Sequence, residues 1–145
     1  MDGHWKDRER RKRRPGLAPW LFFFLALILP GIALSRATSY ITPKYVIAYL
    51  AGISALTAYA YWSDKKKARA DAWRTPEHAL HSLELLGGWA AAFLSQRLFR
   101  HKTVKKEYQF TFWLIAVAHQ CVAFDFLNHW RCAAGIHRFV EAILR

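Results

Sequence analysis

Three titratable side chains in one short segment have the spacing of a catalytic or cation-binding group. Glu77, His81 and Glu84 fall at positions i, i+4 and i+7, which places them on one face if the segment is helical. A histidine with a carboxylate one turn away on either side can act as a general base or relay a proton. Glu77 and His81 are therefore the candidate catalytic residues. The alternative is structural: both lie at the water interface, pair with Arg74 or Lys102 and orient a loop.

Basic side chains and one hydroxyl that are suited to bind a phosphate precede and follow the start of this segment. They are Lys65 and Lys66 in the earlier basic run and Arg97, Arg100, His101, Lys102, Thr103 and Lys105 in the later one. Cations and hydroxyls bind phosphate oxygens, whether on a lipid headgroup or on nucleic acid. The alternative is that these loops only set the orientation of membrane helices. Asp64 is expected to accept a hydrogen bond from Arg100 or Lys102 and so to fix the relative position of the two basic loops.

Three polar residues fall inside apolar stretches: Glu84, Gln96 and His119. An isolated charge within a membrane costs about 2.5–3.5 kcal/mol, so Glu84 is expected to be protonated or paired. Gln96 is a candidate hydrogen-bond partner for Glu84 or His81. Such residues are candidates for proton or metal transport. Polar contacts between helices are the alternative.

The composition indicates a membrane protein. Hydrophobic residues make up 54% of the 145, yet 22 Lys and Arg stand against 10 Asp and Glu, for a net charge of +12. The apolar residues form uncharged blocks with cations between them, whereas a soluble domain spreads them at helix or strand spacing. The aromatic content excludes a disordered basic tail, and two cysteines are too few for a disulfide scaffold or zinc ribbon. Since motifs for phosphate loops, zinc proteases and nucleophile elbows are absent, we expect no cofactor and no metal.

Three runs are long and apolar enough to cross a membrane as helices. Residues 17–34 and 45–62 are uncharged over 18 residues each. At helical rise this is about 27 Å, close to the hydrocarbon thickness of about 30 Å. Residues 108–127 have Asp125 as their single charge. A cleaved signal peptide is the alternative for the first run, which exceeds the usual apolar core of about 7–15 residues.

Residues 77–99 form a shorter third segment. Its apolar part, 83–94, has only 12 residues, a length more typical of a re-entrant or in-plane segment than of a span. Gly87 and Gly88 lie at its centre, where the chain can reverse at little steric cost. Thr75-Pro76 predicts the helix start, with Thr75 as the cap. The basic loops on both sides are expected in the cytoplasm, which favours a re-entrant hairpin over a fourth span.

The two ends of the chain complete the predicted organisation. Residues 1–16 form a basic cytoplasmic arm, 17–127 the membrane domain and 128–145 an amphipathic tail with apolar residues three and four apart. The expected fold is an all-α integral membrane protein. It has three transmembrane helices, a Gly-Gly-broken third segment and a C-terminal amphipathic helix.

Motifs between residues 61 and 113 resemble those of a known bacterial family. In order they are Tyr61-Trp62-Ser63-Asp64-Lys65-Lys66-Lys67-Ala68, Trp73-Arg74-Thr75-Pro76-Glu77, Leu80-His81-Ser82-Leu83, Leu85-Leu86-Gly87-Gly88-Trp89, Gln96-Arg97-Leu98-Phe99-Arg100-His101-Lys102-Thr103, Lys105 and Phe112-Trp113. This order resembles the family called domain of unknown function 1294. The resemblance implies a small multi-pass protein of the bacterial inner membrane. Some members carry an N-terminal cold-shock domain, where this chain has a basic arm and an extra span. The resemblance implies no activity.

The function expected from these features is that of a non-catalytic accessory protein whose basic cytoplasmic loops bind anionic lipid headgroups or an acidic partner. One alternative is a small membrane enzyme or lipid-handling protein that uses Glu77 and His81 on a phosphate held by Arg100, His101 and Lys102. Another is proton or metal transport by an oligomer. Membrane lipids are the expected partners, with a membrane-protein partner or homo-oligomer also open. Nucleic acid ranks lower because the arm has few aromatic residues.

Overall fold

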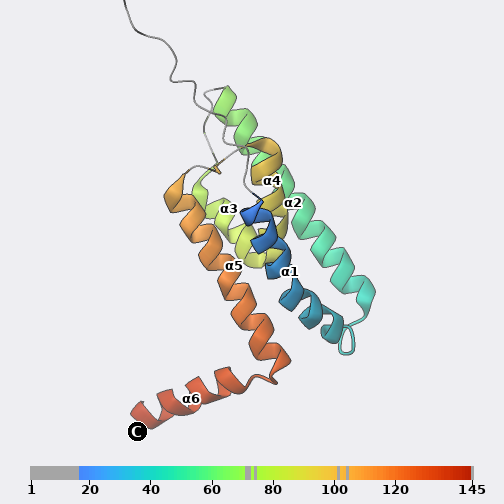
Figure 1. Cartoon of the computed structure of the whole chain (residues 1–145), viewed down its shortest axis with the longest axis vertical. Coiled ribbons are helices and arrows are strands. Elements are labelled where there is room, and N and C mark those ends of the chain that lie inside the picture. Colours follow the sequence, from blue (N-terminus) through green and yellow to red (C-terminus); the bar gives the residue numbers. More distant parts are fainter. Residues whose placement is uncertain (1–16, 71–72, 74, 101, 104, 145) are drawn as a thin grey trace, which may run out of the picture.

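A computed structural model describes residues 17–70, 73, 75–100, 102–103 and 105–144, and these are helical without strands. The helices are α1 (Ala18–Ala37), α2 (Pro43–Arg69), α3 (Glu77–Leu83), the π-helical turn η1 (Glu84–Gly88), α4 (Trp89–Phe99), α5 (Lys106–Leu127) and α6 (Arg131–Leu144). The predicted basic arm 1–16, together with Arg74 and His101, lies outside the described residues. The first five elements and α5 pack into a bundle, and α6 leaves it at an angle (Figure 1).

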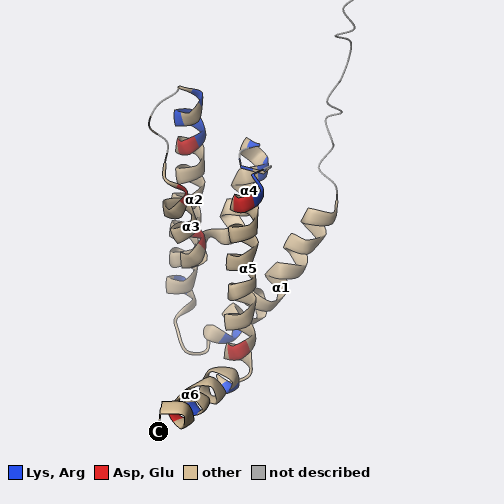
Figure 2. Cartoon of the chain, turned by 90° about the vertical axis from the view of Figure 1, so that its left-hand side faces the viewer, with Lys and Arg blue, Asp and Glu red and all other residues tan. Residues whose placement is uncertain are grey.

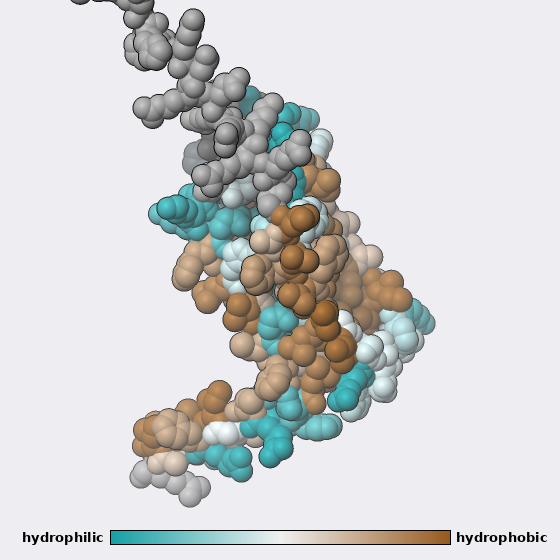
Figure 3. Space-filling view, in the orientation of Figure 1, coloured by the Kyte–Doolittle hydropathy of each residue, from teal (hydrophilic) through white to brown (hydrophobic). Residues whose placement is uncertain are grey.

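Three helices, α1, α2 and α5, are long and apolar enough to cross a membrane. This confirms the prediction of three candidate spans, although α2 extends beyond its uncharged run to Arg69. Most large apolar side chains of these helices face outward, as Phe24 (58% exposed) and Ile47 (66%) do. Such extensive outward apolar surface suits a lipid environment. Figure 3 shows this brown apolar surface over the middle of the bundle.

Helix α1 continues through Pro30 because another helix completes its hydrogen bonding. Proline has no backbone N–H, so the carbonyl four residues earlier, that of Ala26, loses its partner in the helix. The Nε2 of Gln120 on α5 donates to this carbonyl at 2.8 Å. The side chain thus joins α1 to α5 and satisfies a polar group that lipid could not.

Helices α3 and α4 form a hairpin that turns within η1. Gly87 has φ +105°, a conformation that side chains rarely adopt. Gly88 lies against α2 so closely that a Cβ there would be 2.1 Å from the Thr57 hydroxyl. The two outer ends of the hairpin meet again, since Lys105 Nζ lies 2.8 Å from the Glu77 carboxylate. In Figure 1, α3 and α4 therefore run in opposite directions beside α2.

Aromatic rings from four helices form the core of the bundle. Phe23 of α1 stacks on Phe93 of α4 with ring centroids 4.2 Å apart, and Trp89 and Phe112 are buried in the same cluster. Tyr61 of α2 is also part of it. This core holds the hairpin between α1, α2 and α5.

Candidate functional site

The centre of the hairpin carries a buried carboxylate, that of Glu84, which is 0% exposed. The hydroxyl of Tyr61 on α2 donates to its Oε1, and the hydroxyl of Tyr108 on α5 donates to the same oxygen at 2.9 Å. The Nδ1 of His81 on α3 lies 2.6 Å from its other oxygen, Oε2. Glu84 is thus paired, as the sequence led us to expect, and joins three helices through one carboxyl group.

A second layer of amides continues this cluster toward α4 and α5. Gln96 on α4 donates from Nε2 to the Tyr61 hydroxyl at 3.0 Å. Gln109 donates from Nε2 to Gln96 Oε1 at 2.6 Å and to the carbonyl of Lys102 at 3.1 Å. Because the Tyr61 hydroxyl oxygen accepts a hydrogen bond from Gln96, the hydroxyl proton is free to point to the Glu84 carboxylate. Gln96 therefore reaches Glu84 through Tyr61 rather than directly.

A layer of ion pairs lies next to this cluster and ties the hairpin to the end of α2. Lys102 Nζ is 3.3 Å from the buried Asp64 carboxylate and 3.6 Å from Glu77. This confirms Lys102 as the expected partner of Asp64. The hydrogen bond from Lys105 and the positive charges of both lysines lower the pKa of the Glu77 carboxyl below its ordinary value.

One prediction about this segment is wrong in the structure. Thr75 does not cap α3, whose N-cap is Pro76 without a side-chain hydrogen bond. The backbone N–H of Thr75 donates to Asp64 Oδ1 at 3.0 Å. Glu77 pairs with Lys102 and Lys105, which agrees with the structural alternative for this residue, whereas His81 contacts Glu84.

A groove of about 510 Å³ opens where α2 and α4 end. It is lined by Trp62, Lys65, Lys66, Arg69, Ala70 and Phe99. The first four belong to one face of α2, since they are spaced at i, i+3, i+4 and i+7. The ammonium group of Lys66 lies 5.4 Å from the Trp62 ring centre, and that of Lys65 lies 5.7 Å from that of Phe99. Each ammonium group thus lies over an aromatic ring of the groove.

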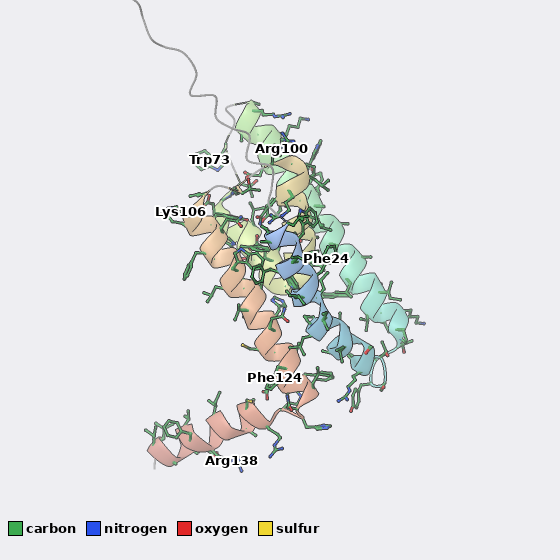
Figure 4. All side chains as sticks on the ribbon, in the orientation of Figure 1. Phe24, Trp73, Arg100, Lys106, Phe124 and Arg138 are labelled. Atoms are coloured by element: carbon green, nitrogen blue, oxygen red, sulfur yellow. The ribbon has the colours of Figure 1, made fainter. Side chains whose placement is uncertain are left out.

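The predicted phosphate-binding residues divide between this groove and other surroundings. Lys65 and Lys66 line the groove, whereas Lys102 and Lys105 form the ion pairs above. Arg97 stacks its guanidinium 3.7 Å from the centre of the Phe93 ring. Arg100 and Thr103 are exposed near the end of α4. Figure 2 shows the blue ends of α2 and α4 at one end of the molecule, and Figure 4 places Arg100 and Lys106 there.

The third intramembrane candidate, His119, lies apart from the buried cluster. Its Nδ1 is 2.9 Å from the carbonyl of Ile115 in its own helix, and its ring is 6.2 Å from that of Trp89. Within the described chain, no three His, Cys, Asp or Glu residues lie close enough together to hold a metal ion.

The tyrosines of the cluster could not be identified from the sequence. Tyr61 and Tyr108 stand at the ends of apolar runs, where tyrosine is explained by its preference for the membrane interface. They lie 23 and 24 residues from Glu84, so no helical spacing links them to it. The one signal in the sequence is that each tyrosine lies at the end of an apolar run. These two ends, of α2 and α5, face the hairpin that carries Glu84.

The comparison with protein families covers this same region. Residues 54–108 match the family described as a protein of unknown function, DUF1294. The matched segment contains Tyr61, His81, Glu84, Gln96 and Tyr108. No curated protein and no solved structure matches the chain. The match to DUF1294 over residues 54–108 confirms the resemblance that the motifs predicted for this part of the chain.

Proposed function

We propose that this small membrane protein is a non-catalytic accessory protein that binds the phosphate of anionic lipid headgroups in the groove between α2 and α4. The observation that carries the proposal is the groove itself, in which Lys65, Lys66 and Arg69 stand beside Trp62 and Phe99. Three cations attract a phosphate. The rings favour the depth at which headgroups meet acyl chains.

The order in which the helices cross the membrane supports a cytoplasmic position for the groove. If the N-terminus is cytoplasmic, α1 leads out and α2 returns, so the end of α2 faces the cytoplasm. The hairpin then enters the membrane and returns on the same side, which brings Arg100 and Lys106 to the same end of the molecule as the groove (Figure 4). This placement agrees with the preference of Lys and Arg for cytoplasmic loops. It gives a re-entrant segment in an inner membrane.

The electrostatic part of this binding has a predictable size. A basic residue near an anionic leaflet contributes about 1 kcal/mol at physiological salt. Replacing Lys65, Lys66 and Arg69 with glutamine is therefore expected to weaken phosphatidylglycerol binding on the order of a hundredfold. The loss shrinks as salt screens the charges.

The test is a lipid titration of the protein in mild detergent, followed by native mass spectrometry of the retained lipids. The control variant carries Gln at Lys67, Arg100 and Lys106, three exposed cations at the same end that do not line the groove. The proposal expects a clearly larger loss of phosphatidylglycerol binding in the groove variant than in the control variant, with phosphatidylcholine binding unaffected and inorganic phosphate a weak competitor. Equal losses in both variants, or none in the groove variant, would contradict it.

A second candidate function rests on one contact, that between His81 and Glu84 at 2.6 Å. A carboxylate that orients an imidazole is the arrangement of a general base, and the His81 side chain is 16% exposed. A membrane enzyme acting on a headgroup would then use Glu84, rather than Glu77, as the partner of His81. His81→Ala would abolish the cellular phenotype of the protein while phosphatidylglycerol binding stays. Loss of both together would argue against this function.

A further inference from the structure

Helix α6 has one continuous apolar face that, in the part of the chain that the structure describes, touches no other helix along most of its length. Ile136, Phe139, Val140 and Ile143 are 45–67% exposed, and they repeat at the spacing of a single helical face. The polar residues Arg131, His137, Arg138 and Glu141 fall on the opposite face. Large apolar side chains displayed in this way need a partner surface.

The joint before α6 fixes its direction. Asp125, near the end of α5, accepts from the backbone N–H groups of Cys132 at 2.8 Å and Ala133 at 3.0 Å. These are N–H groups of the first turn of α6, which have no acceptor within the helix. His129 and Trp130 turn the chain with positive φ values of 56° and 58°. The one charge of the third span is thus used to set the angle of α6.

This angle turns the apolar face toward the apolar flank of the bundle. In Figure 3 the brown surface lies along the side of α6 nearer to the bundle, and teal surface lies along its far side. Arg138 points away from the bundle in Figure 4. His129, Arg131, Ala134, His137 and Arg138 line a basic hollow of about 640 Å³ at this end. The helix lies at the end of the molecule opposite to the ends of α2 and α4 (Figure 1).

We propose that α6 lies flat on the membrane surface opposite to the groove, with its apolar face among the acyl chains. The occupant of this face is the lipid of the same bilayer that α5 crosses, because α6 follows the lipid-facing span after three residues and Trp130 stands at the junction. Arg131 and Arg138 then lie among the phosphates of that monolayer. This inference stands independently of the headgroup groove.

The experiment is spin-label accessibility in vesicles of phosphatidylethanolamine and phosphatidylglycerol. Single cysteines replace Phe139, Ile143, Ala134 or Arg138 in the full chain, in a background of Cys121→Ala and Cys132→Ser. Labels at 139 and 143 are expected to collide with oxygen several-fold more often than with a water-soluble nickel complex. Labels at 134 and 138 should show the reverse preference.

Two results would overturn the proposal. Equal exposure of both faces to the nickel complex would place α6 in water. Exclusion of both reagents from 139 and 143, with dipolar coupling between labels, would assign the face to a second copy of the chain. As a check on the joint, Asp125→Ala should erase the difference between the faces, whereas Asn128→Ala, in the same turn, should preserve it. Retention of the difference in Asp125→Ala would show that Asp125 does not direct the helix.

Discussion

Glu84 is the residue on which the buried polar contacts converge. Its carboxylate accepts from Tyr61 and Tyr108 and lies beside His81. Glu84→Ala would leave two buried hydroxyls without this acceptor, so we expect a loss of about 2–4 kcal/mol in unfolding free energy. Thermal unfolding in detergent measures the loss, with the exposed Glu107→Ala as control. If the loss of unfolding free energy in the double variant Tyr61→Phe/Glu84→Ala equalled the sum of the two single losses, the two side chains would not act as one unit.

Glu77 makes the outer ion pairs sensitive to acid. Lys105 and Lys102 lower its carboxyl pKa in the folded protein, while the unfolded value is about 4.3. A depressed folded pKa gives stability that is complete above the unfolded value and is lost as pH falls through the folded one. Glu77 is 40% exposed, so solvent makes this contribution small.

The prediction is that Glu77→Gln lowers the thermal midpoint slightly at pH 7 and has a smaller effect at pH 3, below the unfolded pKa of the carboxyl. His78→Gln, on the exposed side of α3, serves as the control. An equal effect at both pH values would mean that Glu77 stabilises through packing and not through charge.

At the scale of elements, the hairpin depends on how closely Gly88 approaches α2. A Cβ there would meet the Thr57 hydroxyl at 2.1 Å and the Leu83 carbonyl at 2.8 Å. Gly88→Ala should therefore cost about 1–3 kcal/mol of unfolding free energy. Thr57→Ala in the same chain should recover part of this loss, because it removes the nearer atom. Gly52→Ala, with open space around it, should be neutral or stabilising; a similar loss there would refute the steric account.

The contact between α1 and α5 offers a second test. Gln120→Leu leaves the Ala26 carbonyl without the donor that Pro30 makes necessary. We expect a loss of about 1–3 kcal/mol. In a Pro30→Ala background the new N–H can bond to Ala26, so the same substitution should cost much less. The four thermal midpoints of this cycle measure the coupling, and purely additive effects would contradict it.

The long helices could be predicted because a single property decides them. An uncharged run must be long enough to cross the membrane, and this criterion located α1, α2 and α5. Partners of polar side chains were harder to predict, because they come from distant parts of the chain. Gln120 bonds to Ala26, 94 residues away, and Asp64 accepts from the backbone N–H of Thr75, 11 residues away. Spacing along one helix carries no information about such pairs.

For the whole molecule, the consequence is a protein with two unlike ends. The ends of α2 and α4 gather the groove, the ion pairs and most of the described lysines at one end (Figure 2). The loop from α1 to α2 and the helix α6 lie at the other end (Figure 1). The headgroup proposal requires that the hairpin returns to the side it entered. A fourth span would separate the two basic loops by the full thickness of the membrane.

Cysteine accessibility in sealed inner-membrane vesicles and whole cells tests this claim most directly. Single cysteines replace Lys67, Thr103 and Ser39, all exposed, in a chain without Cys121 and Cys132. A membrane-impermeant maleimide should label 67 and 103 only from the cytoplasmic side, and 39 only from the opposite side. Labelling of 103 from the side of 39 would make residues 77–99 a fourth span and contradict the account.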